Sequence, residues 1–212
     1  MADRVAVAEA GDEAVRSAFD RCIRGGGVVV FPADTVYGLA CDPLDADAIG
    51  RIDALKGRDE RKPSAVMFFS PLRMRELVSA LGSRTREALG ALLPGPVTAV
   101  VHNPQRRYPL ACREDPERLG VRLIEGPLAG AASAVLQTSA NRSGALAPRR
   151  LEDVDPAIVS GAELAIDGGE LRGEASTVVD LSRIESGGGW RVLRAGAMGE
   201  GEIERRLTAA LA

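Results

Sequence analysis

The strongest constraint on the fold is an alternation between helical stripes and short, wholly apolar runs of β-branched residues. Residues 12–24 carry apolar side chains at helical spacing and stop at three glycines, while residues 27–31 read GVVVF and are followed by Pro32. A short apolar run of this kind is typical of a strand that is buried on both faces. The chain is therefore expected to build a sheet that helices cover.

Other segments repeat this alternation and complete the expected set of elements. Apolar runs predict strands, and apolar residues at helical spacing predict helices. Asp45 and Ser70 are the expected N-caps of two of these helices. Because strands and helices alternate irregularly, the prediction is an α/β fold with a twisted, mixed sheet and flanking helices. Further strands are expected at 65–69, 97–102, 120–124, 176–181 and 190–194, helices at about 45–57, 70–81, 84–93, 127–136 and 200–211, turns at 138–144 and 185–190, and a surface loop at 147–156.

Length and composition limit the class of protein. The 212 residues fit one domain, since domains commonly have roughly 100 to 200 residues, and 45% apolar residues are enough to build a core. The net charge of −3 argues against a chain that coats nucleic acid by bulk charge. No apolar run approaches the roughly 20 residues that cross a bilayer, and the first residues lack the pattern of a signal peptide. We therefore expect a cytoplasmic protein with no membrane partner.

Cysteine and histidine are too sparse to indicate a metal site or a histidine-based catalytic triad. Cys22, Cys41 and Cys112 are widely spaced and form no CxxC motif, so they are expected to be small buried side chains. His102 is the sole histidine and is expected at the end of a strand with no catalytic role. Charge stabilisation and positioning are therefore the expected sources of any rate enhancement.

A basic loop follows the predicted helix at 45–57. The chain has only two lysines among its 27 basic residues, and both Lys56 and Lys62 fall in the segment LKGRDERKP together with Arg58. One interpretation is a cradle for the phosphates of a nucleotide, and the other is a solvated charged turn. The sequence contains neither GxxxxGK[ST] nor GxGxxG, so it supports neither a P-loop nor a Rossmann dinucleotide site.

Further polar residues lie at the expected strand ends, where an α/β fold usually forms its pocket. Arg122 interrupts an otherwise apolar strand, so its guanidinium needs an anion, and a bound carboxylate would serve. The segment TSANRSG offers Ser139 and Asn141, which could bind a ligand or equally cap a helix or form a turn. Thr35 lies in a polar segment that follows the buried strand ending at Pro32. This segment could contribute to the pocket or could simply be an edge-strand turn.

Taken in order, FPADTVYGLACDP, KGRDERKP, PGPVT, GVR, TSANRSG, STVVDL and LRAG resemble motifs of the YrdC/YciO-like family over about residues 12–197. Each motif alone is weak, but their shared order and spacing are specific. The resemblance implies a YrdC-like fold with a large concave pocket, formed by residues 1–212 as a single domain. It also implies a nucleotidyltransferase, because the characterised enzymes of the family are threonylcarbamoyl-AMP synthases.

The resemblance further implies the reaction and its partners. The expected substrates are L-threonine, bicarbonate and ATP, with Mg2+ accompanying the phosphates, and the expected products are threonylcarbamoyl-AMP and pyrophosphate. The adenylate would feed the N6-threonylcarbamoyl modification of adenosine 37 in tRNA through downstream transfer machinery.

Site residues are carried over from the family motifs position by position. Lys56 and Arg58 match its KxR signature and are expected to be catalytic, and no residue is expected to bind a metal. The expected nucleotide-binding residues are Arg58, Lys62, Asn141 and Arg194, and the expected threonine-binding residues are Thr35, Arg122, Ser139 and Ser176.

The chain departs from the family pattern on the amino-acid side of the expected pocket. Met67 stands where the synthases often carry a histidine, and Ile124 and Gly126 stand where the family tends to have a proline and a histidine. Two alternatives therefore remain open. One is a non-catalytic family member that binds a nucleotide, tRNA or double-stranded RNA, and the other is the same carbamoyl-adenylate chemistry with a different acceptor amine.

Overall fold

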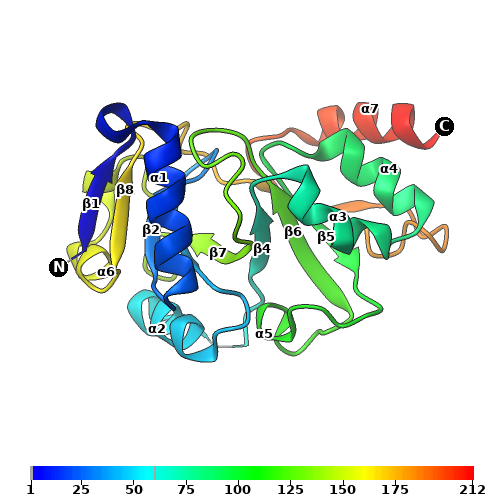
Figure 1. Cartoon of the computed structure of the whole chain (residues 1–212). Helices are drawn as coiled ribbons and strands as arrows, with labels where there is room; N and C mark the ends of the chain where they lie inside the picture. Colours follow the sequence, from blue (N-terminus) through cyan, green and yellow to red (C-terminus); the bar gives the residue numbers. More distant parts are fainter. Residues whose placement is uncertain (1, 60) are drawn as a thin grey trace.

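Within residues 2–59 and 61–212, which this computed structural model describes, ten strands form one mixed sheet (Figure 1). The strands are β1 (Asp3–Ala6), β2 (Val29–Pro32), β3 (Tyr37–Cys41), β4 (Ala65–Phe68), β5 (Val97–His102), β6 (Arg118–Leu123), β7 (Val135–Ser139), β8 (Leu164–Asp167), β9 (Thr177–Asp180) and β10 (Arg191–Arg194). Their order is β1-β8-β2-β3-β7-β4-β6-β5-β9-β10, and the pairs β1–β8, β8–β2, β4–β6 and β5–β9 are parallel. The predicted α/β fold with a mixed sheet is confirmed.

Most helices begin and end where the sequence predicts. Asp45 caps α2 by accepting a hydrogen bond of 2.9 Å from the amide of Ala48, and Ser70 caps α3 through the amide of Leu72. Gly57 ends α2 with a φ of 57°, a conformation that favours glycine. The helices are α1 (Val7–Arg24), α2 (Ala46–Lys56), α3 (Pro71–Ser79), α4 (Ser83–Leu92), α5 (Pro109–Cys112), α6 (Pro156–Ser160) and α7 (Glu200–Leu211), with a 3-10 turn at Leu151–Asp153.

The two faces of the sheet are covered unequally. In β6, Leu119, Val121 and Leu123 point into an apolar cluster that also receives buried residues from α2, α3, α4, α5, α6 and α7. On the opposite face, α1 packs Phe19 and its neighbours into a second cluster, and Figure 1 shows α1 in front of β8 and β2. This second cluster extends as far as β4 and β7. In the described part of the chain no helix covers the same face of β6, β5 and β9, so the α1 side of the sheet is half open.

The predicted helix at 127–136 is wrong. Residues 127–134 form turns and irregular structure, and Val135 already belongs to β7, which lies between β3 and β4. Gly130 adopts a φ of 90° and donates its amide to the carbonyl of Phe69 at 2.6 Å, which a continuous helix would not allow. Strand pairing on both sides of β7 therefore outweighs the helical propensity of the alanines.

Strands β1, β3 and β8 were not predicted, and α1 begins earlier than expected. Strand β3 contains Gly38 and directly follows a polar segment, so its pattern is that of a turn. Gly38 is required there, because a β-carbon at this position would lie 2.9 Å from the ring of Phe31 and 3.1 Å from the side-chain amide of Gln137. Helix α1 starts at Val7 and is interrupted at Gly11, whose φ is 75°, so its regular part begins close to the predicted residue 12.

Asp20 fixes the loop that replaces the predicted helix. Its buried carboxylate accepts hydrogen bonds of 2.9 Å from the amides of both Ala132 and Ser133. An amide side chain offers only one acceptor oxygen, so Asp20→Asn is expected to lower the free energy of unfolding by about 2 kcal/mol, measured by urea denaturation. Glu13→Gln, an exposed change in the same helix, is the control and should shift it by less than about 0.5 kcal/mol. Equal stability of the two variants would contradict this role.

No helix within residues 2–59 and 61–212 has both the length and the apolar character that spanning a membrane requires.

Candidate functional site

A cavity of about 330 Å³ lies on the half-open face of the sheet. Its floor consists of strand residues on the face of the sheet opposite to the larger apolar cluster, among them Thr98 and Val100 of β5 and Gly120 of β6. Residues 63–65 and the end of β7 close one side, and residues of β9 and β10 close another. The cavity therefore occupies the area that α1 leaves free.

Six of the nine predicted site residues line this cavity, and three do not. The lining residues are Thr35, Arg58, Arg122, Ser139, Ser176 and Arg194. Lys56 is buried behind the wall, Lys62 is exposed, and Asn141 lies in the turn beyond β7 without lining the cavity. The sequence therefore identified side chains from separate parts of the chain that the fold brings together, although their individual roles stay predictions.

Four guanidinium groups line the cavity, and two of them are neutralised by the carboxylates of the buried Asp180 and the partly buried Asp34. Arg118 lies 2.9 Å from Asp180, and Arg122 forms an ion pair with Asp34. Within the described residues, neither Arg58 nor Arg194 has a carboxylate within ion-pair distance. These two groups therefore give the cavity the net positive charge that an anionic ligand needs.

Arg58 joins the basic loop to the end of β7. Its Nη1 donates to Ser64 Oγ at 2.9 Å and to Thr138 Oγ1 at 3.1 Å, and its Nη2 donates to the carbonyl of Pro63 at 2.6 Å. Burial lowers the pKa of Arg58, while the nearby charge of Asp53 acts in the opposite direction. The fork is thus held rigidly at the wall of the cavity.

Lys56 contacts the turn after β7 through the backbone. Its Nζ donates to the carbonyl of Ser139 and, at 2.6 Å, to the carbonyl of Asn141. Burial, with a smaller contribution from Arg58, lowers the pKa of Lys56 from 10.5 to about 8. The ammonium therefore reaches the serine-alanine-asparagine turn, and in this structure it fixes the backbone of that turn from behind the wall.

Asn141 uses its side-chain amide within its own turn. Its Nδ2 donates to the carbonyls of Arg142 at 3.0 Å and Ala145 at 2.6 Å. Its Oδ1 is buried and has no hydrogen-bond partner among the described residues. The side chain thus combines the turn-forming role with one acceptor that remains available.

Arg122 finds its anion within the chain. The sequence predicted an anion for this group and suggested a bound carboxylate, but the carboxylate of Asp34 is already paired with Nη2, and Gln137 Oε1 lies 3.3 Å from Nη1. Burial lowers the pKa of Arg122, and Asp34 opposes that change. One further atom of each partner, Asp34 Oδ2 and Arg122 Nε, is buried and has no hydrogen-bond partner among the described residues. The same holds for Oγ1 of Thr35, the residue that follows Asp34.

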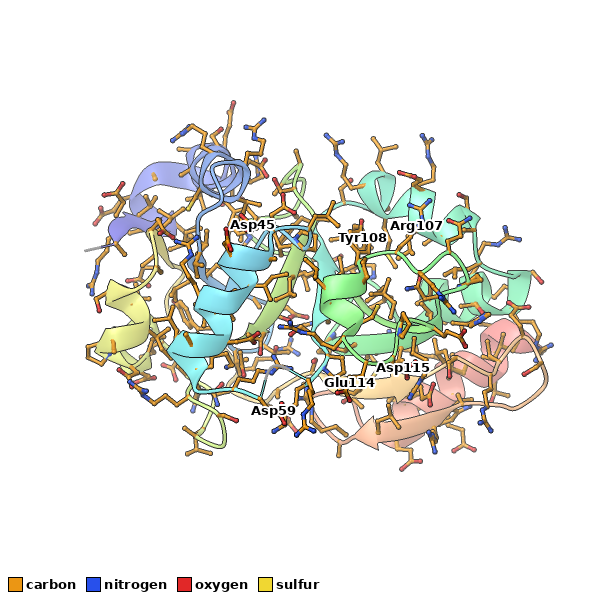
Figure 2. All side chains as sticks on the ribbon, turned by 90° about the horizontal axis from the view of Figure 1, so that it is seen from below. Asp45, Asp59, Arg107, Tyr108, Glu114 and Asp115 are labelled. Atoms are coloured by element: carbon orange, nitrogen blue, oxygen red, sulfur yellow. The ribbon has the colours of Figure 1, made fainter. Side chains whose placement is uncertain are left out.

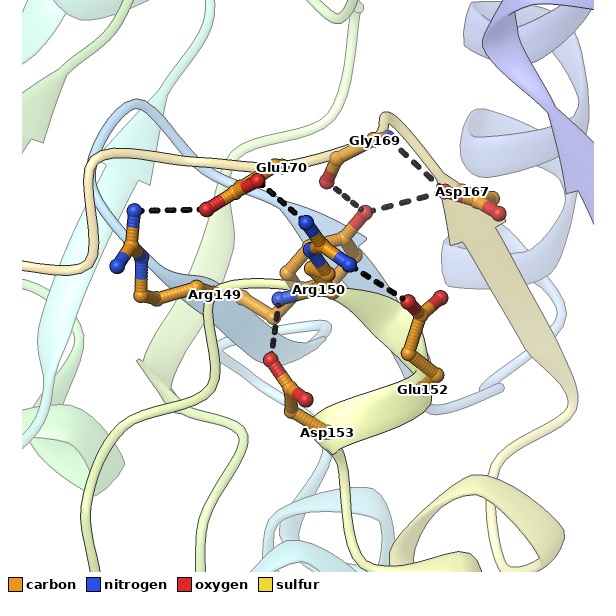
Figure 3. A network of polar contacts seen from close by, with 8 residues as sticks. Arg149, Arg150, Glu152, Asp153, Asp167, Gly169 and Glu170 are labelled. Carbon is orange, nitrogen blue, oxygen red and sulfur yellow. Dashed lines mark hydrogen bonds and ion pairs between the residues drawn. The ribbon is translucent and has the colours of Figure 1, made fainter.

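Backbone contacts on both sides hold the segment that contains Thr35. The carbonyl of Thr35 accepts a hydrogen bond of 2.9 Å from the amide of Gly173. Two residues later, the hydroxyl of Tyr37 donates to the carbonyl of Gly169 at 2.9 Å. Figure 3 shows Gly169 beside the ion pairs of Arg149 and Arg150 with Glu170. Burial raises the pKa of Tyr37 to about 12. The ion pairs thus join the loops that support the cavity wall at Thr35.

Ser176 and Arg194 form the wall at the β9–β10 side. Arg194 Nη2 donates to the carbonyl of Ser176 at 2.7 Å and lies 3.3 Å from its hydroxyl. The same hydroxyl lies 2.9 Å from the hydroxyl of Thr98. Arg194 is therefore oriented by neutral acceptors, and no carboxylate among the described residues pairs with it.

An ion pair between Arg113 and Asp53 supports the basic loop from outside the cavity. Arg113, which follows α5, lies 2.5 Å from the buried carboxylate of Asp53 in α2. Figure 2 shows Asp59 and Asp115, in the segments that follow α2 and α5, both in the lower half of the view. The amide of Ser64 also donates to the carbonyl of Ala111 at 2.9 Å, so α5 helps to position the loop that carries Arg58.

Three residues that shape the cavity were given no role from the sequence. Asp34 was recognised only as part of the polar segment that contains Thr35, and the position of Gln137 in β7 was hidden by the predicted helix. Arg118 could have been found, because it lies four residues before Arg122 in one strand and therefore faces the same side.

Two of the three residues that depart from the family pattern are buried in the apolar core. Met67 and Ile124 are buried in the α1 cluster and do not line the cavity, and Gly126 adopts a φ of 111° in the loop beyond β6. His102 is the exposed last residue of β5, as predicted. Of the three free cysteines, Cys41 and Cys112 are buried and Cys22 is partly exposed, so the prediction of buried side chains holds for two.

The comparisons with known proteins agree with this geometry. The family model named for Sua5, YciO and YrdC, and described as Telomere recombination, matches residues 21–196. Threonylcarbamoyl-AMP synthase of Thiobacillus denitrificans is 32% identical over 167 residues, which cover 76% of this chain and 87% of that protein. The synthase of Halorhodospira halophila is 34% identical over 137 residues, covering 62% and 71%.

Solved structures of the family share the fold. Sua5 of Pyrococcus abyssi in complex with L-threonine superposes with a TM-score of 0.82 and 28% identity, covering 97% of this chain and 60% of that one, so the chain spans only part of that protein's length. YciO of Escherichia coli has a TM-score of 0.80 at 22% identity and covers 96% of this chain and all of that one, which supports the fold alone. With a family model that matches most of its length, the chain belongs to the Sua5/YciO/YrdC family.

Proposed function

We propose that this chain is a threonylcarbamoyl-AMP synthase, a nucleotidyltransferase that serves N6-threonylcarbamoyladenosine formation in tRNA. The observation that carries the proposal is the composition of the cavity wall. Arg58 and Arg194 provide charge without a carboxylate partner in the described structure, while Thr35 and Arg122 offer buried polar atoms that lack partners. The first pair suits phosphates, and the second suits the small polar groups of an amino acid.

The reaction requires two bonds to form in sequence. The nitrogen of L-threonine attacks the carbon supplied by bicarbonate, with loss of water, to give a carbamate. A carbamate oxygen then attacks the α-phosphorus of ATP, and the bond from that phosphorus to the β-phosphate breaks, so that pyrophosphate leaves with the bonding electrons. Both steps depend on holding three reactants together and on stabilising negative charge, and neither needs a histidine base.

Roles for the chain's residues follow from their contacts. Arg58 and Arg194 would stabilise the charge on the phosphates, assisted by Lys62 from the exposed loop. The unpartnered oxygen of Asn141 would accept a hydrogen bond from a donor of the nucleotide, such as a ribose hydroxyl. Lys56 would act by fixing the turn after β7, because its ammonium is bonded to backbone carbonyls. The threonine-binding residues would be Thr35, Arg122, Ser139 and Ser176, all of which line the cavity.

The carboxylate set at the cavity does not suit a resident metal ion. Asp115 is the only carboxylate among the described lining residues, and it lies 3.5 Å from Arg118. Among the residues that the structure describes there is also no group of three or more potential metal ligands. Mg2+ therefore enters the proposal as a companion of the triphosphate, since this ion commonly binds through substrate phosphates.

The remaining parts of the proposal concern the protein's setting. We place residues 1–212 in one YrdC-like domain, supported by the single sheet that all described strands share. The chain would work in the cytoplasm and pass its adenylate to the machinery that transfers the threonylcarbamoyl group to tRNA. RNA itself is not required for the adenylate-forming step.

Pyrophosphate release tests the proposed function directly. Purified protein with ATP, L-threonine and bicarbonate is expected to release pyrophosphate, and omission of either L-threonine or bicarbonate should lower the rate by at least about tenfold, because the carbamate is the nucleophile. A parallel series with the other amino acids tests the acceptor, since Met67 and Ile124 are apolar and pack in the α1 cluster, on the face of the sheet that also holds the cavity. Release that does not depend on bicarbonate would contradict the proposal.

A further inference from the structure

We infer that Asp34 is a positioning residue that orients the guanidinium of Arg122 toward the carboxylate of the amino-acid substrate. The inference rests on the proposed function and deepens it. Asp34 does not line the cavity, whereas Arg122 does. The carboxylate therefore acts on the substrate through the arginine.

The contacts of Arg122 leave one part of its fork available. Asp34 holds Nη2, and Gln137 lies 3.3 Å from Nη1, while Nε is buried and has no partner among the described residues. The guanidinium is planar and rigid, so fixing two nitrogens also fixes the direction of the third. A guanidinium carries five N–H donors, so three of those of Arg122 are not taken up by Asp34 and Gln137, and their directions are fixed for a group bound in the cavity that Arg122 lines.

The buried charge of Arg122 makes the partner essential. Its side chain is only 3% exposed, and a guanidinium at such a site is strongly disfavoured without a counter-ion. Asp34 neutralises this charge, so Arg122 would recognise the substrate carboxylate mainly by hydrogen-bond geometry, while Arg194 contributes the unbalanced positive charge nearby.

The neighbouring residue links this pair to the substrate. Thr35 lines the cavity and follows Asp34 directly in the chain, and its hydroxyl has no partner among the described residues. A shift of Asp34 would therefore disturb both Arg122 and Thr35. Because Arg58 contacts residues 63–64 and Thr138, and neither Asp34 nor Arg122, the same shift should leave the nucleotide side unaffected.

The test compares Asp34→Asn with Asp20→Asn, a matched change at a buried carboxylate that serves only the loop at 132–133. In the bicarbonate-dependent pyrophosphate assay, Asp34→Asn is expected to raise KM for L-threonine by about tenfold and to leave KM for ATP within about twofold. Asp20→Asn should leave both KM values unchanged. A purely structural role of Asp34 would raise neither KM selectively.

A substrate analogue gives a second, sharper measurement. L-threoninamide retains the reactive amine but lacks the carboxylate that Arg122 would bind. The wild type is expected to prefer L-threonine over L-threoninamide in kcat/KM, and Asp34→Asn should reduce that preference by about tenfold. If Asp34→Asn does not fold, Gln137→Met removes the other acceptor and should reduce the preference in the same direction, by about threefold.

The outcomes separate this inference from the proposed function. A wild type without bicarbonate-dependent activity would overturn the proposed function and, with it, the substrate on which the inference rests. An active wild type with an unchanged preference in Asp34→Asn would overturn the inference alone. An equal rise of both KM values would also overturn it, since that result indicates general damage to the cavity.

Discussion

Arg58→Ala is expected to lower kcat/KM for bicarbonate-dependent pyrophosphate release by about a thousandfold. The guanidinium lines the cavity without a carboxylate partner in the described part of the chain, so its charge is available to the phosphates. Its bonds to Ser64 and Thr138 hold it in place before a ligand binds, which is the condition under which such a group contributes most to rate. Steady-state kinetics at saturating L-threonine and bicarbonate would measure the loss.

Two variants separate the role of Arg58 from the net charge of the loop. Arg61→Ala removes a positive charge three residues away, but Arg61 is exposed, paired with Asp59 and absent from the cavity wall, so activity should change by less than about twofold. Arg58→Lys keeps the charge and loses the fork, and should still cost about a hundredfold. An Arg58→Ala enzyme within tenfold of wild type would show that phosphate stabilisation comes from elsewhere.

The sequence predicts the strands of one half of the sheet better than those of the other. Strands β4, β5, β6, β9 and β10 lie in apolar or alternating runs, and each was expected within a few residues of its observed bounds. Strand β3 carries Gly38 because a side chain there would collide with Phe31, a constraint that exists only once β2 and β3 are paired. Strand β7 was concealed by alanines whose helical preference is overridden by pairing on both sides.

In the candidate site, the sequence shows which residue needs a partner but not which residue provides it. Arg122 could be singled out because a guanidinium in an apolar strand needs a partner. The identity of that partner could not be predicted, because Asp34 is 88 positions away and approaches only through the order of strands in the sheet. Likewise, Lys56 was expected to face a ligand, but its bonds to two backbone carbonyls depend on where β7 ends.

Lys56→Met is expected to lower activity by about a hundredfold and the free energy of unfolding at pH 7 by about 2 kcal/mol. The change leaves the buried carbonyls of Ser139 and Asn141 without their donor, so the turn that carries both residues can move away from its position at the cavity. Pyrophosphate release and urea denaturation would measure the two effects. Full activity in this variant would contradict the positioning role.

The pH dependence of that stability difference tests the lowered pKa of Lys56. Lys56 has a pKa of about 8 in the folded protein and about 10.5 when unfolded, so between these values the unfolded chain binds more protons. Stability due to this residue must therefore rise with pH in that window, by about 2 to 3 kcal/mol between pH 7 and pH 10. Lys56→Met lacks this contribution, so its deficit relative to wild type should widen as the pH rises. A constant deficit would show that Lys56 keeps its ordinary pKa in the folded protein, and a deficit that narrows would show a raised pKa, since all other titrating groups are common to both proteins.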